Sequence, residues 1–179
     1  MQPHVAHGDL EPHNILITDQ GRACLAYVVQ SEQEDTQFRT PTGQLVWGGT
    51  LNYMAPELHK AVNNATRHSV NKRACDMYAL GCTIYAAYTG RDPFHVLTPR
   101  QVIQGERPDF PKDVISPDMW SFVENLWSSN PSERLTAKKA LAWMEHKATG
   151  EGMDISLPTF EKEWEWKPCN DHGGPFCTA

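Results

Sequence analysis

His7, Asp9 and Asn14 are three chemically active side chains that lie within eight residues, in the pattern H-x-D-x-x-x-x-N. A carboxylate beside a hydroxyl group can orient it and accept its proton, and an amide oxygen can hold a magnesium ion that bridges phosphates. The pattern therefore indicates phosphoryl transfer, with Asp9 acting on the hydroxyl and Asn14 on the metal. An unrelated polar loop can match three positions by chance, so other segments must decide between these interpretations.

Two short apolar runs follow these side chains and predict a β-hairpin. Ile15–Ile17 is rich in β-branched residues, Thr18–Gly21 has the composition of a turn, and Ala23–Ala26 supplies the second run. A hairpin directly after Asn14 would give the polar loop a rigid support, where catalytic groups tend to lie.

The H-x-D-x-x-x-x-N pattern resembles the catalytic loop of eukaryotic protein kinases. Gly49–Glu57 resembles the end of the kinase activation segment, G-T-x-x-Y-M-A-P-E. Asp76–Gly81 resembles the family's D-V-Y-S-L-G, and Asn130–Thr136 resembles its P-x-x-R-x-T/S. These motifs occur in the family's order, so Val5–Met144 resembles the C-terminal lobe of a protein kinase from the catalytic loop onward.

The resemblance assigns roles to the residues of the first motif. It implies that His7, Asp9 and Asn14 are catalytic, that Asn14 holds magnesium, that ATP is the phosphate donor, and that Thr50 positions the substrate. The Thr50 signature, without the tyrosine-kinase form of the catalytic loop, points to the serine/threonine or tyrosine-kinase-like branch. Gly21–Ala26 is in addition similar to kinase-like proteins of fungi.

The resemblance also assigns structural roles. It implies an ion pair between Glu57 and Arg134, because a guanidinium suits a carboxylate through two parallel hydrogen bonds. It implies that Asp76 binds the backbone of the catalytic loop, although an acid at the start of a helix can also be a simple cap.

Several positions depart from the family pattern. Gly8 stands where the arginine of H-R-D is expected, and Glu11 stands where a basic residue would face the transferred phosphate. The position of D-F-G reads Tyr27, Val28 and Val29, so a phenol that is neutral near pH 7 replaces the magnesium-binding aspartate. The 179 residues also contain no Gly-rich loop and no strand with the ATP-binding lysine. On this basis we expect the N-terminal lobe to be absent and the binding of ATP and magnesium to be doubtful.

Three functions remain open after these departures. The chain can be an inactive kinase-like module, a pseudokinase or truncated kinase that binds a protein partner. It can be an active serine/threonine kinase whose ATP-binding lobe is supplied by upstream sequence, or a decayed gene product without a function. The altered chemistry in a retained helical lobe favours the first.

The predicted fold class is mainly α, with a kinase-like helical lobe and one short hairpin at the catalytic loop. Apolar spacing predicts helices over Ala74–Thr89, Ser116–Ser129 and Ala137–Met144, the first of them central and buried. The helix between Phe94 and Gly105 is expected to be clipped, and the polar stretch Gln30–Thr42 is expected to be a loop.

We expect one kinase-like domain over residues 1–146 and a tail over 147–179 without family resemblance. Three potential metal ligands occur in that tail, Cys169, His172 and Cys177, but a structural zinc site needs a fourth, so no metal site is predicted there.

Composition limits the classes of partner. The net charge is −6, which argues against nucleic acid or an anionic membrane as the main partner. No apolar run approaches the roughly 20 residues that span a bilayer, and the N-terminus lacks the regions of a signal peptide. Five cysteines without a regular spacing suggest reduced thiols. We therefore expect a protein of the cytoplasm or nucleus with a protein substrate or partner.

Overall fold

Helix α3 (Lys72–Thr89) is the longest helix of the computed structural model, which describes residues 6–26, 37–39, 45–47, 51–61, 69–95 and 97–150. For 37–39 and 45–47 only the backbone is described. The chain divides into two units, Met1–Leu141 and Ala142–Ala179, which are considered separately.

Both ends of α3 follow from local sequence signals. The Asn71 side chain accepts a hydrogen bond from the Ala74 N–H at 3.2 Å, which caps the first turn. Gly90 ends the helix in the left-handed conformation, with φ of 66°, and donates its N–H to the Ala86 carbonyl at 2.8 Å. The helix begins at Lys72, slightly before the predicted Ala74, because Asn71 acts as the cap.

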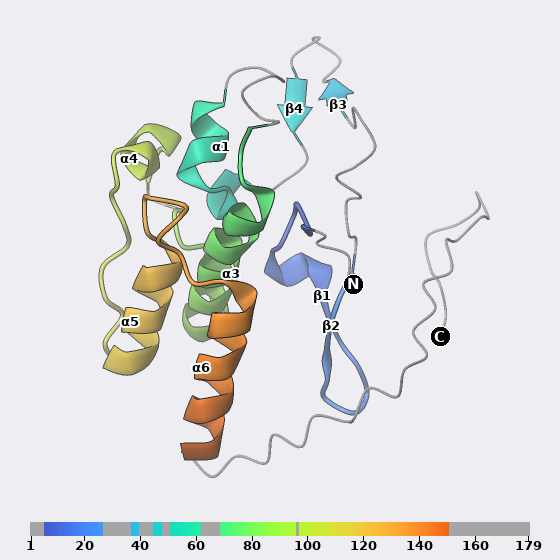
Figure 1. The fold of residues 1–179 in the computed structure, drawn as a ribbon, viewed down its shortest axis with the longest axis vertical. Coiled ribbons are helices and arrows are strands. Elements are labelled where there is room, and N and C mark those ends of the chain that lie inside the picture. Colours follow the sequence, from blue (N-terminus) through green and yellow to red (C-terminus); the bar gives the residue numbers. More distant parts are fainter. Residues whose placement is uncertain are drawn as a thin grey trace, which may run out of the picture. The chain divides into compact units, whose positions relative to one another are not determined.

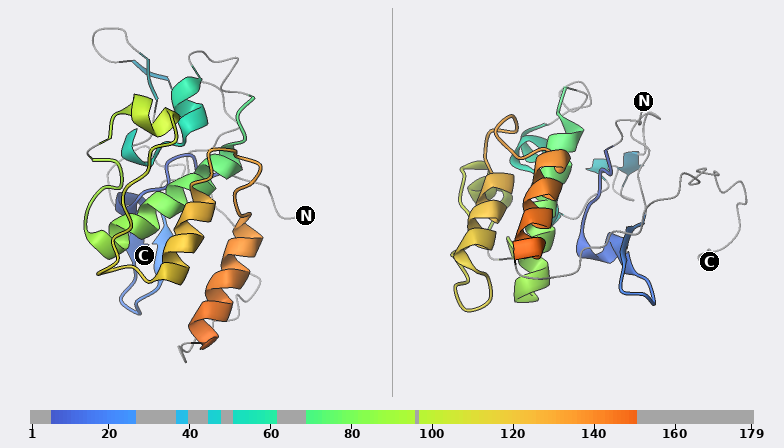
Figure 2. Two further views of the ribbon diagram at one scale, coloured as in Figure 1. Left: turned by 90° about the vertical axis from the view of Figure 1, so that its left-hand side faces the viewer. Right: turned by 60° about the horizontal axis from the view of Figure 1, so that its bottom comes forward.

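The core of the first unit lies between α3 and α5 (Pro117–Leu126), which pack against each other. In the left view of Figure 2, α3 (green) lies at an angle to α5 (yellow). Gly81 permits this close packing, because a Cβ atom there would lie only 2.8 Å from Nε1 of Trp127. Tyr78 and Cys82 of α3 and Val123 of α5 are fully buried at this interface. The prediction of a central buried helix is therefore confirmed.

Helix α5 begins as the sequence predicts and ends earlier. The Ser116 side chain accepts from the Met119 N–H at 3.3 Å, and Pro117 occupies the first helical position. The predicted end at Ser129 is wrong, since the last helical residue is Leu126. The Trp127 carbonyl accepts a hydrogen bond from Arg107 at 2.8 Å instead of continuing the helical ladder.

Four short elements complete the surroundings of the site. The clipped helix predicted before Gly105 is α4 (Pro99–Ile103), which contacts α1 (Pro56–Lys60). Two 3₁₀ turns, η1 (Pro12–Asn14) and η2 (Leu51–Tyr53), both contact α3. Figure 1 shows α3 in green and α1 in teal. The catalytic-loop segment and the segment before α1 therefore meet on the same helix.

The predicted hairpin is present. Strand β1 (Ile15–Ile17) pairs in antiparallel fashion with β2 (Ala23–Leu25), with Leu16 opposite Cys24. Gly21 has a φ of 74° in the turn and donates its N–H to the Thr18 carbonyl at 2.8 Å.

A second hairpin corrects the loop predicted at Gln30–Thr42. Strand β3 (Gln37–Arg39) pairs with β4 (Leu45–Trp47), with Phe38 opposite Val46. Its strands contain Phe, Val and Trp, which favour β structure, and a Pro- and Gly-containing segment separates them in the sequence. The rest of Gln30–Thr42 lies outside the described residues.

Helix α6 (Ala137–Gly150) includes the predicted Ala137–Met144 and continues beyond it. Residues 145–150 include the good helix formers Glu145, Lys147 and Ala148 and no proline, which explains the extension. The packing of this helix on α3 stays a prediction, and the tail with Cys169, His172 and Cys177 lies outside the described residues. Within the described ranges, no helix has the length and apolar character needed to cross a membrane.

Candidate functional site

The loop that contains His7, Asp9 and Asn14 is closed by the Asn14 side chain. Its amide nitrogen Nδ2 donates to the backbone carbonyl of Asp9 at 2.7 Å and to the carboxylate oxygen Oδ2 of Asp9 at 3.2 Å. The 3₁₀ turn η1 brings Asn14 back toward Asp9, with the Asn14 N–H donating to the Glu11 carbonyl at 3.1 Å. The structure therefore brings together the carboxylate and the amide that the sequence pattern singled out.

Asp76 of α3 anchors the start of this loop through the backbone. Its Oδ2 accepts from the His7 N–H at 2.7 Å, and its Oδ1 accepts from the Gly8 N–H at 3.0 Å. Burial raises the pKa of Asp76, and the hydrogen bonds from the two N–H groups offset only part of this effect. The arrangement is the one that the resemblance implied, and the alternative of a simple helix cap is not observed.

The backbone conformation at position 8 explains why a glycine suits this position, which the sequence analysis did not predict. The φ of Gly8 is 83°, in the left-handed region that glycine adopts without strain. The residue therefore lets both N–H groups, of His7 and of Gly8 itself, point to one carboxylate. The glycine at the middle position of H-x-D is the signal in the sequence for this conformation.

The His7 side chain links the loop to the end of strand β2. Its Nδ1 accepts from the Asp9 N–H at 3.3 Å, and its Nε2 lies 2.9 Å from the Ala26 carbonyl. These partners assign a neutral ring that is protonated on Nε2, because a carbonyl can only accept. His7 is buried, and its ring contacts the backbone of Asp9 and of Ala26.

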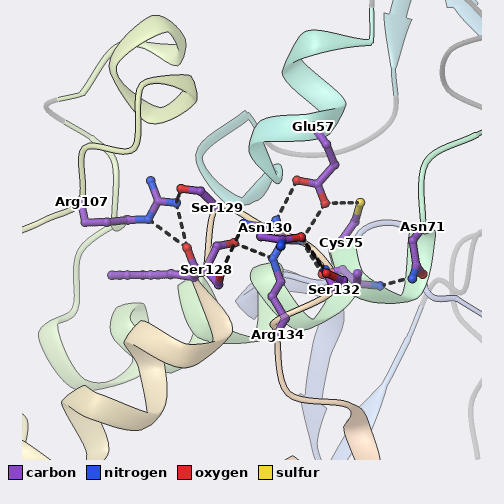
Figure 3. Close-up of polar contacts among 11 residues, drawn as sticks. Glu57, Asn71, Cys75, Arg107, Ser128, Ser129, Asn130, Ser132 and Arg134 are labelled. Atoms are coloured by element: carbon purple, nitrogen blue, oxygen red, sulfur yellow. Dashed lines mark hydrogen bonds and ion pairs between the residues drawn. The ribbon is translucent and has the colours of Figure 1, made fainter.

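Glu57 and Arg134 form the predicted contact (Figure 3). The two guanidinium nitrogens Nη1 and Nη2 of Arg134 lie 2.6 and 2.7 Å from the two carboxylate oxygens of Glu57. Arg134 also donates to the carbonyls of Ala74, at 2.7 Å, and Ser128, at 2.9 Å. The fully buried arginine thus joins α1, α3 and the segment after α5. Cys75 adds a thiol 3.3 Å from Glu57.

A polar cluster at η2 was not predicted. The Tyr53 hydroxyl donates to Oδ1 of Asp92 at 2.7 Å, and the Asn52 amide donates to Oδ2 of Asp92 at 3.1 Å. Burial, the hydrogen bond to Asp92 and the charge of Asp92 all raise the pKa of Tyr53. No local pattern signals this contact, because some forty residues separate the partners in the sequence.

Four of the predicted site residues lie outside the described part of the chain: Thr50, Tyr27, Val28 and Val29. Glu11 is described and half-buried at the start of η1, where its side chain does not cap the turn.

Comparison with known families decides the assignment. The model of the protein kinase domain matches residues 2–144. The chain belongs to the protein kinase family. This confirms the family predicted from the motifs, and the mainly helical fold is in accord with a partial kinase fold.

Similar proteins are serine/threonine kinases that are much longer than this chain. A probable serine/threonine-protein kinase of Dictyostelium discoideum is 29% identical over 147 residues, which are 80% of this chain and 30% of that protein. Serine/threonine-protein kinase SCH9 of Candida albicans is 31% identical over 136 residues, 74% of this chain and 16% of that protein. The chain thus spans less than a third of the length of these two relatives.

A solved structure shares the fold. The crystal structure of Rad53 1–466 in complex with AMP-PNP is similar with a TM-score of 0.56 and 30% sequence identity. The match covers 76% of this chain and 33% of the Rad53 chain.

Kinase membership implies ATP and magnesium as cofactors, and the described residues fit part of a magnesium site. Because Nδ2 of Asn14 is engaged by Asp9, its amide oxygen Oδ1 stays available among the described residues. Those residues contain no group of three or more His, Cys, Asp or Glu side chains that could hold a metal ion. Magnesium is usually held by one or two carboxylates together with substrate phosphates. Asn14 would therefore be one neutral ligand of a magnesium ion that other groups must complete.

Proposed function

We propose that this kinase segment orients a serine or threonine hydroxyl of a protein, and that it does not transfer phosphate by itself. The contact between Asp9 and Asn14 supports the proposed orientation of the hydroxyl, since it holds the Asp9 carboxylate in a fixed loop. The finer assignment to serine/threonine chemistry is supported by relatives of that class. A protein partner, rather than nucleic acid or membrane, agrees with the net charge of −6.

The orienting role depends on two features of Asp9. Its side chain is partly exposed, so a hydroxyl can approach it, and its backbone N–H is fixed by the His7 ring at 3.3 Å. A carboxylate in such a position accepts the hydrogen bond of an alcohol and sets the direction of its lone pairs. This alone is binding and orientation, and it is the part of kinase chemistry for which the chain has its own residues.

The charges near the phosphate position disfavour phosphate transfer by this chain. Phosphoryl transfer depends on positioning and on neutralising the phosphate charge. Glu11 brings a negative charge to the position two residues after Asp9, where the family uses a basic residue, and Tyr27 replaces the aspartate that binds magnesium. A like charge at about 4 Å disfavours phosphate by at least about 1 kcal/mol, and by more when it is desolvated. The 179 residues also lack the lysine strand that grips the α- and β-phosphates.

A second candidate is an active kinase whose ATP-binding residues lie in chain outside these 179 residues. The intact anchoring of the loop by Asp76 favours it, because this anchor keeps Asp9 and Asn14 in place regardless of the nucleotide. The modest share of the relatives' length that the chain spans agrees with it.

A phosphate-transfer assay separates the two candidates. The purified chain is incubated with labelled ATP, magnesium and a generic protein substrate, beside an Asp9→Asn variant and an Asp19→Asn variant. Asp19 is an exposed residue of the hairpin turn and serves as the matched control. We expect no transfer above background from any of them. Transfer by the parent and by the Asp19 variant that disappears in the Asp9 variant would establish an active enzyme and refute the proposal.

A nucleotide titration and a charge-restoring variant examine the reason for inactivity. ATP should bind weakly, with little dependence on magnesium, because the described residues supply only Asn14 as a ligand. The double variant Glu11→Lys, Tyr27→Asp should still fail to transfer phosphate, since no lysine strand is present. Transfer by this double variant would show that the two charges, rather than the missing lysine, are what prevents catalysis.

A further inference from the structure

We draw no further inference here: the strongest candidate, the apolar surface of the β1–β2 hairpin where Leu16, Ile17 and Leu25 are exposed, carries no proposal because nothing in the described part of the structure shows what covers it.

Discussion

Substitution of Arg134 by methionine tests how far the kinase lobe depends on its buried ion pair. Methionine keeps much of the apolar length of the side chain and removes every hydrogen-bond donor, together with the guanidinium carbon that lies 5.1 Å from the Tyr78 ring centroid. Arg134 donates two hydrogen bonds to Glu57 and one each to the Ala74 and Ser128 carbonyls. All four acceptors therefore lose their charged donor in a single step.

The burial of the ion pair sets the size of the expected loss in the free energy of unfolding. The Arg134 side chain is 0% exposed and the Glu57 side chain is 18% exposed, so water cannot replace the lost donors well. Removing one member of a buried ion pair costs about 3–5 kcal/mol, because the other charge is left uncompensated. A domain of ordinary stability, about 5–15 kcal/mol, would lose a large fraction of its free energy of unfolding.

Urea unfolding at pH 7, followed by tryptophan fluorescence and far-UV circular dichroism, measures this loss. The matched control is Arg100→Met, an exposed arginine of the short helix α4, which should change the free energy of unfolding by no more than about 0.5 kcal/mol. Arg134→Lys should fall between the two, since lysine keeps the charge but not the paired geometry. An Arg134→Met loss below about 1 kcal/mol would refute the reasoning.

The pH dependence supplies an independent check. Burial alone would raise the pKa of Glu57, but the hydrogen bonds and charge of Arg134 outweigh it and lower the pKa. Because the pKa of Glu57 is lower in the folded than in the unfolded chain, where it is about 4.3, the ionised carboxylate stabilises the fold at pH values above about 4.3. This stabilisation is lost as the pH falls through the pKa of the folded chain. Without Arg134, only the hydrogen bonds from the backbone and from Cys75 oppose the effect of burial, so Glu57 takes up its proton at higher pH. The difference between parent and Arg134→Met should therefore be largest near pH 7 and shrink below about pH 4, and a constant difference would contradict the assigned cause.

Three further substitutions test packing, a polar contact and an exposed surface. Gly81→Ala should lower the free energy of unfolding by up to about 2 kcal/mol, because overpacking against Trp127 outweighs the gain in helix propensity. Tyr53→Phe should lower it by about 1–1.5 kcal/mol, since the hydrogen bond to Asp92 is lost. Ile17→Thr should reduce concentration-dependent light scattering of the isolated chain, because Ile17 is 66% exposed on a short sheet.

Each of these has a matched control. Gly150→Ala should cost nothing, because its Cβ would meet no atom within 4 Å. Tyr88→Phe, at a half-exposed tyrosine, should leave unfolding unchanged, and Val114→Thr should not alter the scattering. Equal effects in a variant and its control would contradict the corresponding assignment.

Local signals in the sequence were sufficient for much of the fold. The start of α5 at Pro117 and the end of α3 before Gly90 follow from capping chemistry, which depends only on neighbouring residues. Strand β3 (Gln37–Arg39) was not predicted, because three residues in a polar stretch are too few to show the alternation of apolar and polar side chains that indicates a strand. The bond between Tyr53 and Asp92 depends on the approach of two distant segments, which composition and spacing do not encode.

The candidate site was predictable where a motif carried it, and its departures can be understood from the geometry. Asp76 binds backbone N–H groups, so it holds the loop whatever side chain follows His7. Gly8 even suits this arrangement, because its φ of 83° is one that an arginine would adopt only with strain. Glu11, in contrast, takes no part in the hydrogen bonds between Asp9 and Asn14, so its charge can change without disturbing the loop. Folding of the loop therefore rests on the hydrogen bonds of Asp76, Asp9 and Asn14, and the Glu11 carboxylate is not among these groups.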